Sequence, residues 1–220
     1  MSLLNRLDFN TCCLKIKQIG EEIGEYWSWL DFKHNTEQKY LTKTSNLALK
    51  LSKSNFNTPN DVEVEVTPTD LSEEDELVVE VSHKEMVRFE HHVVYSDSYS
   101  VPVLYFNAYY QDGTQLSLQE IWNLITDDYQ HALQDKWSFL TQQEHPYLQR
   151  PFFQLHPCHT ETMLKTLLSS QGDCYENNSH NHPGCGNIVL MWLSAVAPIA
   201  QLKLSMHYFQ QQFKQIEKEI

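Results

Sequence analysis

Two β-rich runs near the middle of the chain place the strongest constraint on its fold. Residues 86–95, MVRFEHHVVY, and residues 101–110, VPVLYFNAYY, are rich in β-branched and aromatic side chains, which favour strands. The serine-rich segment SDSYS between them is typical of a turn. The two runs are therefore expected to pair as antiparallel neighbours, with Pro102 near a strand start or an edge because it has no N–H to donate.

The remaining periodicities predict helices around this sheet, with one more strand at residues 40–51, where Leu47, Leu49 and Leu51 alternate with other residues. Helical spacing or a capping side chain such as Ser117 or Thr160 predicts helices at 1–26, 118–129, 161–169, 188–196 and 205–218. The aromatic residues 26–30 are expected to close the first helix, and residues 137–147 to be irregular. The order predicts an α+β fold with an antiparallel sheet of about four or more strands flanked by helices.

Length and charge narrow the class of protein. The chain has 220 residues, enough for one domain, which we expect to span 1–220 with a mobile acidic loop at 53–82 and a loop insertion at 171–187. The formal net charge of −13 argues against nucleic acid or an anionic membrane as the main partner. No apolar run is long enough for stable membrane insertion, and no signal peptide is evident at the N-terminus.

Cysteine usage points to a reducing compartment. The five cysteines are odd in number and irregularly spaced, which does not suit a disulfide framework and predicts a cytoplasmic protein with free thiols. Cys12 and Cys13 fall in the first predicted helix and are expected to be packing residues. Residues Cys174, His180, His182 and Cys185 form C-x5-H-x-H-x2-C, but the histidines are too close together for a usual zinc finger, and we expect no metal.

Cys158 is the candidate for chemistry. It lies in His156-Pro157-Cys158-His159, a polar and stiff setting that does not suit a core thiol. A helix that begins near Thr160 would direct its N-terminal N–H groups toward the sulfur and favour the thiolate. No arginine follows in the position that a phosphatase loop needs, and no Cys-x-x-Cys pair is present. A cysteine hydrolase, which needs a histidine brought close by the fold, stays open.

Three stretches carry a resemblance to a known family. The runs TQQEHPYLQRPFFQLHPC at 141–158, YSDSYSVPVLYFNAYYQDG at 95–113 and LSLQEIW at 116–122 resemble the E2-like conjugating enzymes of autophagy. Within these enzymes the chain resembles the family of autophagy-related protein ten, and the likeness extends to WLSAVAPIAQL at 192–202. The second autophagy E2-like enzyme would carry a much longer insertion between the strands.

The resemblance implies both a fold and an activity. The fold is an E2-like (UBC-like) core in which Cys158 accepts a ubiquitin-like modifier, the twelfth autophagy-related protein, as a thioester from an E1-like activating enzyme. The modifier then passes to a lysine of the fifth autophagy-related protein, forming the isopeptide bond needed for autophagosome formation. The activating enzyme consumes the ATP, so no cofactor is expected here. A second ubiquitin-like client stays open.

The supporting residues of this site are not settled by the resemblance. Ordinary ubiquitin E2 enzymes place His-Pro-Asn ahead of their cysteine, whereas this chain has His145-Pro146-Tyr147, so the group that stabilises the oxyanion is not identified. Candidates are His145, His156 and the backbone amides after Cys158, with Pro157 as a stiffening element. A purely structural role for His145 stays equally open. A non-catalytic adaptor of E2-like fold also remains an alternative.

Overall fold

The computed structural model describes residues 4–32, 35–50, 84–125, 140–169 and 186–210. Its elements in chain order are α1 (Arg6–Ile23), β1 (Ser28–Phe32), β2 (Asn35–Lys50), β3 (Lys84–Ser96), β4 (Val101–Tyr109), α2 (Leu118–Leu124), β5 (Leu140–Glu144), β6 (Pro151–Leu155), α5 (Pro157–Ser169) and α6 (Ile188–Val196). The acidic loop predicted at 53–82 and most of the insertion predicted at 171–187 lie outside the described residues.

One antiparallel sheet organises the molecule. Its six strands follow the order β1-β2-β3-β4-β6-β5, and each neighbouring pair is antiparallel. β3 and β4 pair with Val93 opposite Leu104, which confirms the hairpin predicted from the sequence. β6 lies beside β4 with Phe153 opposite Phe106, so the strand that leads to Cys158 is held next to the middle of the sheet.

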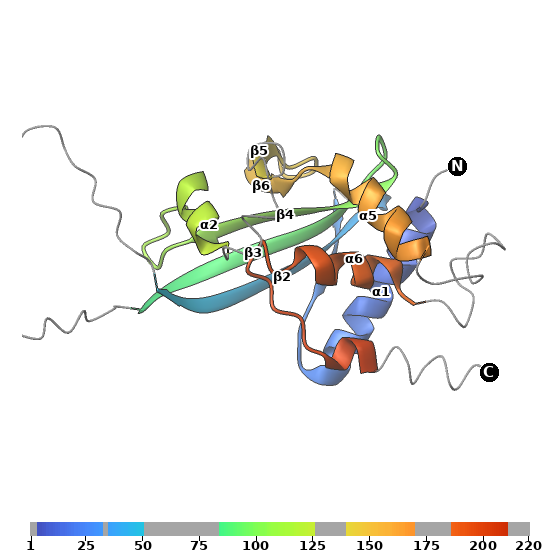
Figure 1. Ribbon diagram of the computed structural model, residues 1–220, viewed down its shortest axis with the longest axis horizontal. Coiled ribbons are helices and arrows are strands. Elements are labelled where there is room, and N and C mark those ends of the chain that lie inside the picture. Colours follow the sequence, from blue (N-terminus) through green and yellow to red (C-terminus); the bar gives the residue numbers. More distant parts are fainter. Residues whose placement is uncertain (1–3, 33–34, 51–83, 126–139, 170–185, 211–220) are drawn as a thin grey trace, which may run out of the picture.

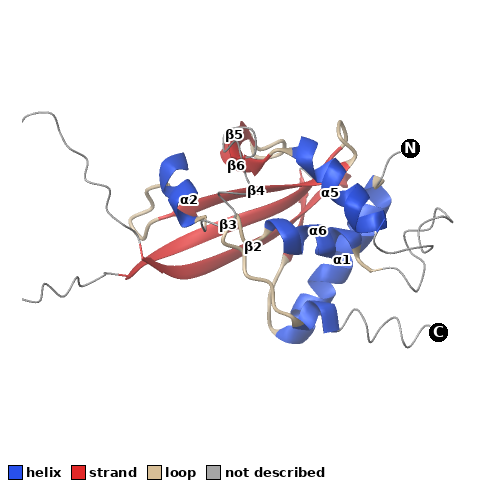
Figure 2. Ribbon diagram, in the orientation of Figure 1, coloured by secondary structure: helices blue, strands red, loops and turns tan. Residues whose placement is uncertain are grey.

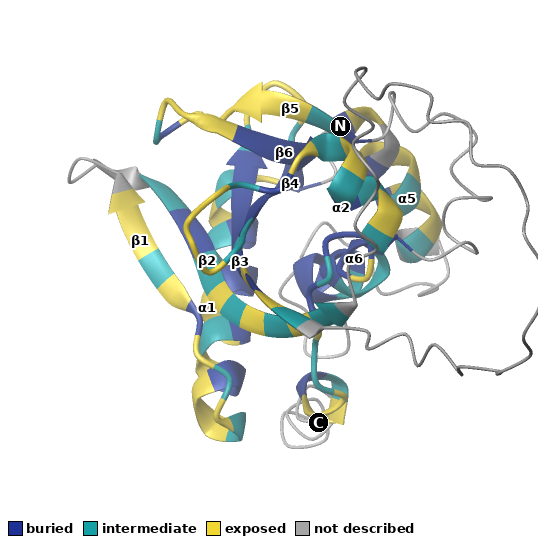
Figure 3. Cartoon of the chain, turned by 90° about the vertical axis from the view of Figure 1, so that its left-hand side faces the viewer, coloured by how far each residue is buried: buried dark blue, intermediate teal, exposed yellow. Residues whose placement is uncertain are grey.

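Helices α1, α5 and α6 lie together on one side of the sheet (Figure 1). α1 contacts β1 and β2, α5 contacts β4, and α6 contacts both other helices. Figure 2 shows that α2 stands apart from them, beside the far end of β4. Figure 3 shows buried segments of β4, β6 and α6 around the interior and mostly exposed residues on the edge strands β1 and β5. The α+β architecture predicted from the sequence is confirmed.

Local sequence fixes the ends of the helices that carry the core. The Asn5 side chain accepts a backbone N–H in the first turn of α1 at 2.8 Å, and Gly24, at φ 77°, ends the helix in the left-handed region. Asn187 caps α6 and also donates to the backbone carbonyl of Cys12 at 2.8 Å. Because this bond joins the start of α6 to the middle of α1, the two helices are fixed relative to each other.

Several sequence predictions of secondary structure were wrong at short strands. β1 lies where aromatic residues were expected to close the first helix, and β5 lies in the segment 137–147 expected to be irregular. No element was predicted for the residues of β6. Each has five residues, too few for a clear alternation. Pairing with a neighbouring strand, which depends on tertiary packing, therefore decided their structure.

The predicted helices fared better. α1 and α6 are confirmed, and Ser117 caps α2 through a capping box with Glu120, although α2 ends at Leu124. For the helix predicted at 205–218, the described residues are helical from 207 to 210. Among the helices of the described segments, none combines the length and apolar character that crossing a membrane requires.

Candidate active site

The His156-Pro157-Cys158 segment connects β6 to α5. β6 ends at Leu155, and α5 begins at Pro157, which suits the first helical position because proline lacks an N–H and has a helical φ. The helix therefore begins four residues before residue 161, the start predicted with Thr160 as the cap. As a result, Cys158 belongs to the first helical turn rather than to the loop before it, with its side chain exposed.

The His156 imidazole faces the Cys158 thiol. Its Nδ1 atom lies 2.8 Å from Cys158 Sγ and accepts the Cys158 backbone N–H at 3.2 Å. Because the backbone N–H donates to Nδ1, this nitrogen carries a lone pair in the neutral ring, and the thiol hydrogen has the same nitrogen as its acceptor. The arrangement gives an exposed thiol a base at hydrogen-bond distance.

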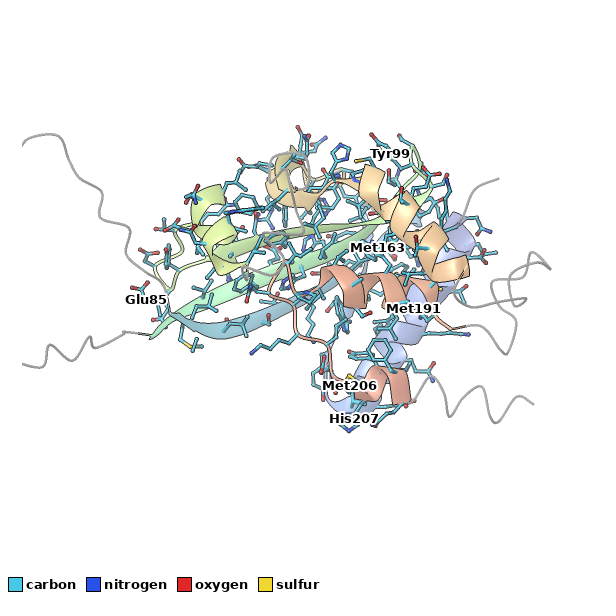
Figure 4. All side chains as sticks on the ribbon, in the orientation of Figure 1. Glu85, Tyr99, Met163, Met191, Met206 and His207 are labelled. Carbon is cyan, nitrogen blue, oxygen red and sulfur yellow. The ribbon has the colours of Figure 1, made fainter. Side chains whose placement is uncertain are left out.

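The turn between β3 and β4 borders this pair. Tyr99, labelled in Figure 4, lies in that turn with its ring edge-on to the His156 ring and 6.2 Å between centroids. The next residue, Ser100, has φ 54°, a left-handed conformation that is uncommon for residues other than glycine. The sequence analysis did not identify Tyr99, because only the position of β6 beside β4 brings the turn to His156.

His145 is placed differently from the other candidates. It is fully buried, and its Nδ1 accepts the backbone N–H groups of Tyr147 and Leu148, each at 3.2 Å. The proton of the neutral ring is therefore on Nε2, which donates to His92 Nδ1 at 3.1 Å. His92 in turn donates from Nε2 to Glu90 at 3.1 Å.

Burial and neighbouring charges keep His145 neutral and Glu90 ionised in this series of hydrogen bonds. Burial first, and then the proximity of His92 and Arg150, lower the pKa of His145 to about 3. Burial would raise the pKa of Glu90, but its hydrogen bond with His92 and the charges of His92, Arg150 and Arg88 lower it overall. Both ring nitrogens of His145 are thus engaged within the core, and the structure does not bring His145 to the Cys158 thiol.

The other cysteines of the described segments are packing residues, as predicted. Cys12 and Cys13 are buried in α1. Burial raises the pKa of Cys12 to about 11 and that of Cys13 well above its ordinary value. The Cys174–Cys185 pattern weighed as a zinc site lies outside the described residues, and within those residues no group of three or more His, Cys, Asp or Glu side chains is arranged to hold a metal.

The antiparallel sheet with helices on one side and the exposed cysteine at the start of a helix agree with the E2-like fold predicted from the sequence. The model of the family "Autophagocytosis associated protein, active-site domain" matches residues 8–207. The chain is 31% identical to the human ubiquitin-like-conjugating enzyme ATG10 over 91% of this chain and 90% of that protein. It is 33% identical to the Arabidopsis thaliana enzyme of that name over 82% of each chain, and 36% identical to the Dictyostelium discoideum one over 54% and 53%. The chain therefore belongs to the autophagy-related protein ten family.

Proposed function

We propose that the chain is a conjugating enzyme that carries a ubiquitin-like modifier as a thioester on Cys158 and transfers it to a lysine of a target protein. The observation that carries the proposal is the exposed Cys158 thiol 2.8 Å from the His156 imidazole. This pair lies within the stretch matched by an active-site domain. The names of the relatives, ubiquitin-like-conjugating enzymes, support the same activity.

In the loading step, the Cys158 thiol gives its proton to Nδ1 of His156. The thiolate attacks the carbonyl carbon of the thioester that joins the modifier to its activating enzyme. The bond from Sγ to that carbon forms, the bond to the activating enzyme's cysteine breaks, and its sulfur leaves as a thiolate. The proton on His156 then passes to the departing thiolate or to water. One thioester replaces another, so the exchange is redox-neutral and needs no cofactor.

In the transfer step, the amine of the target lysine attacks the Cys158 thioester. The carbon–nitrogen bond forms, the carbon–sulfur bond breaks, and the amine releases a proton to His156 or water as the Cys158 thiolate leaves. Holding the lysine close to the thioester supplies much of the rate. Pro157, which is buried, supports this step by fixing the helix start that carries Cys158. His145 has no part in the chemistry, because its ring nitrogens are engaged elsewhere.

The family resemblance supports specific partners. The thioester comes from an E1-like activating enzyme that consumes ATP, the modifier is the twelfth autophagy-related protein, and the target is the fifth. An exposed cysteine would also accept a second ubiquitin-like client. The reaction takes place in the cytoplasm, where reducing conditions keep the thiol free.

A charging assay tests the proposal. The chain is mixed with the E1-like enzyme, ATP and the modifier, and the products are separated with and without reducing agent. The wild type is expected to form an adduct that reduction removes. Cys158→Ser is expected to form one that survives, because an alkoxide leaves far less readily than a thiolate. Cys174→Ser and Cys185→Ser serve as controls and should behave as wild type.

Three results would overturn the proposal. A reducible adduct on Cys158→Ser would mean that another cysteine is the acceptor. Cleavage of a modifier thioester or conjugate without any adduct would indicate a cysteine hydrolase. The absence of any adduct on wild type, with the modifier seen charged on the E1-like enzyme, would indicate a non-catalytic adaptor.

A further inference from the structure

Arg6, in the first turn of α1, makes three contacts that meet near the candidate active site. Its guanidinium forms an ion pair with Asp97, lies 5.1 Å from the centroid of the Tyr95 ring, and interacts with the side chain of Tyr147, which helps to raise the pKa of Arg6. The neighbouring Leu4 is fully buried, and its carbonyl accepts the Tyr95 hydroxyl at 2.8 Å. The start of α1 is therefore fastened to the end of β3.

Two of these contacts lead to His156 and to His145, each of which precedes a proline. Asp97 opens the turn that holds Tyr99 against His156. Tyr147 donates its backbone N–H to Nδ1 of His145. A single guanidinium thus joins the turn beside the candidate nucleophile to the turn that follows β5.

The turn beside Cys158 needs support from outside itself. Ser100 at φ 54° holds a conformation that is disfavoured for a residue with a β-carbon, and Tyr99 is 48% exposed, so packing holds it on one side only. The Arg6–Asp97 ion pair fastens the first residue of the turn to a helix that is anchored in the core. Loss of that pair would free the Asp97 end of the turn from α1, while the pairing of Ser96 with Val101 still closes the turn and the helix and sheet stay folded.

We propose that Arg6 is a positioning residue for Cys158, with Asp97 as its partner. Arg6 holds the β3–β4 turn where Tyr99 confines the His156 ring, and the confined ring keeps Nδ1 at the Cys158 sulfur. The proposal rests on the proposed conjugating function for its rate measurements. The positioning role can also be measured without any partner protein, because the rate at which a small alkylating reagent reacts with Cys158 depends on the same geometry.

The expected pattern is a loss of rate without a loss of fold. Ion pairs with an exposed partner contribute little to stability, whereas displacing a reacting group by about an ångström can slow a reaction by up to about 100-fold. For Arg6→Ala we expect the single-turnover rate of thioester formation at saturating activating enzyme to fall about tenfold. The half-saturating concentration of the activating enzyme should change little, because the α1 backbone stays in place.

Matched variants separate positioning from general damage. Lys17→Ala removes another ion pair of α1, with Glu21, one helical turn apart, and should charge as wild type with a similar melting temperature. Arg6→Lys keeps the charge but loses the planar contact with the Tyr95 ring, and should be intermediate. The double swap of Arg6→Asp with Asp97→Arg restores an ion pair and should recover part of the rate lost by Arg6→Asp alone.

Iodoacetamide labelling, read at each cysteine by peptide mass spectrometry, completes the test. The labelling rate at Cys158 should change in Arg6→Ala and remain at the wild-type value in Lys17→Ala. Equal labelling and equal charging in the two variants would overturn the proposal, as would a loss confined to the half-saturating concentration. A wild type that never charges would overturn the conjugating function instead, while a change in labelling would still support the positioning role.

Discussion

The described part of the chain contains two His-Pro pairs, and they share a local bond but differ in surroundings. In His145-Pro146 and His156-Pro157 alike, the imidazole Nδ1 accepts the backbone N–H two residues later, at 3.2 Å in both cases. His145 is fully buried, whereas His156 is half-buried beside an exposed thiol. The dipeptide therefore sets the orientation of the ring, and the tertiary surroundings decide what the ring can do.

Burial turns the first pair into a structural element. His145 passes a hydrogen bond through His92 to Glu90 and packs against the rings of Tyr40, Tyr105 and Phe152. With both nitrogens bonded and the ring enclosed, the imidazole holds strands together and exchanges no proton with a substrate. At the second pair, the remaining contact of Nδ1 is the Cys158 sulfur, which leaves the ring available for proton transfer.

His145→Ala should break the buried pair and cause the largest effect. The substitution empties a volume lined by aromatic rings and leaves His92 Nδ1 and two backbone N–H groups without their partner. We expect the free energy of unfolding to fall by about 4 kcal/mol, measured by urea denaturation. A loss below about 1 kcal/mol would contradict the structural role, because surface substitutions alone cause losses that small.

His156→Ala should show the opposite pattern. The free energy of unfolding should change by less than about 1 kcal/mol, while thioester formation should slow by about 100-fold through loss of the base, measured in a single-turnover charging assay. His156→Asn is the control, because its side chain can still accept the Cys158 backbone N–H but cannot take the thiol proton. Full recovery of the rate in His156→Asn would contradict proton transfer and leave His156 as a helix cap.

As the pH falls, the stability contributed by the neutral buried histidines should be lost before the neighbouring carboxylates take up protons. Burial, as the main cause, lowers the pKa of His145 to about 3 and that of His91, which bonds the Ala200 carbonyl, to about 4, from 6.5. Their folded pKa values lie below the unfolded value, so the neutral rings contribute full stability above about pH 6.5 and lose it as the pH falls. Each should remove about 2 kcal/mol by pH 5.

Urea denaturation at pH 7 and pH 5 measures this loss. Glu90, whose pKa is lowered from 4.5, stays ionised between pH 7 and pH 5 and therefore does not contribute to the measured change in the free energy of unfolding. His145→Gln should remove the His145 share of the pH dependence and leave that of His91. A free energy of unfolding that is equal at the two pH values would show that the buried rings take up protons without penalty.

The central hairpin predicted from the sequence is confirmed, and Cys158 stays the candidate nucleophile, but the different placement of His145 and His156 was not predicted. Cys158 stands out because polar, stiff neighbours do not suit a buried thiol, and β3 and β4 stand out because their composition favours strands. Comparison of the triplet His145-Pro146-Tyr147 with His-Pro-Asn made His145 a candidate catalytic group and left a purely structural role equally open. The burial of His145 depends on Tyr40, Tyr105 and Phe152, which come from three different strands. The sequence around His145 therefore does not predict that these rings enclose it.

The two prolines should show the smallest difference. Each restricts its φ angle and so lowers the entropy of the unfolded chain, worth roughly 0.4–1 kcal/mol. Pro146 is exposed and Pro157 is buried at the start of α5. Pro146→Ala should therefore lower the free energy of unfolding by about 0.5 kcal/mol, and Pro157→Ala by about 1.5 kcal/mol, because its ring also leaves the core. Urea denaturation resolves the two values. Equal losses would show that the burial of Pro157 does not stabilise the helix start, and the rigidity of the segment that carries Cys158 would then have to come from His156 alone.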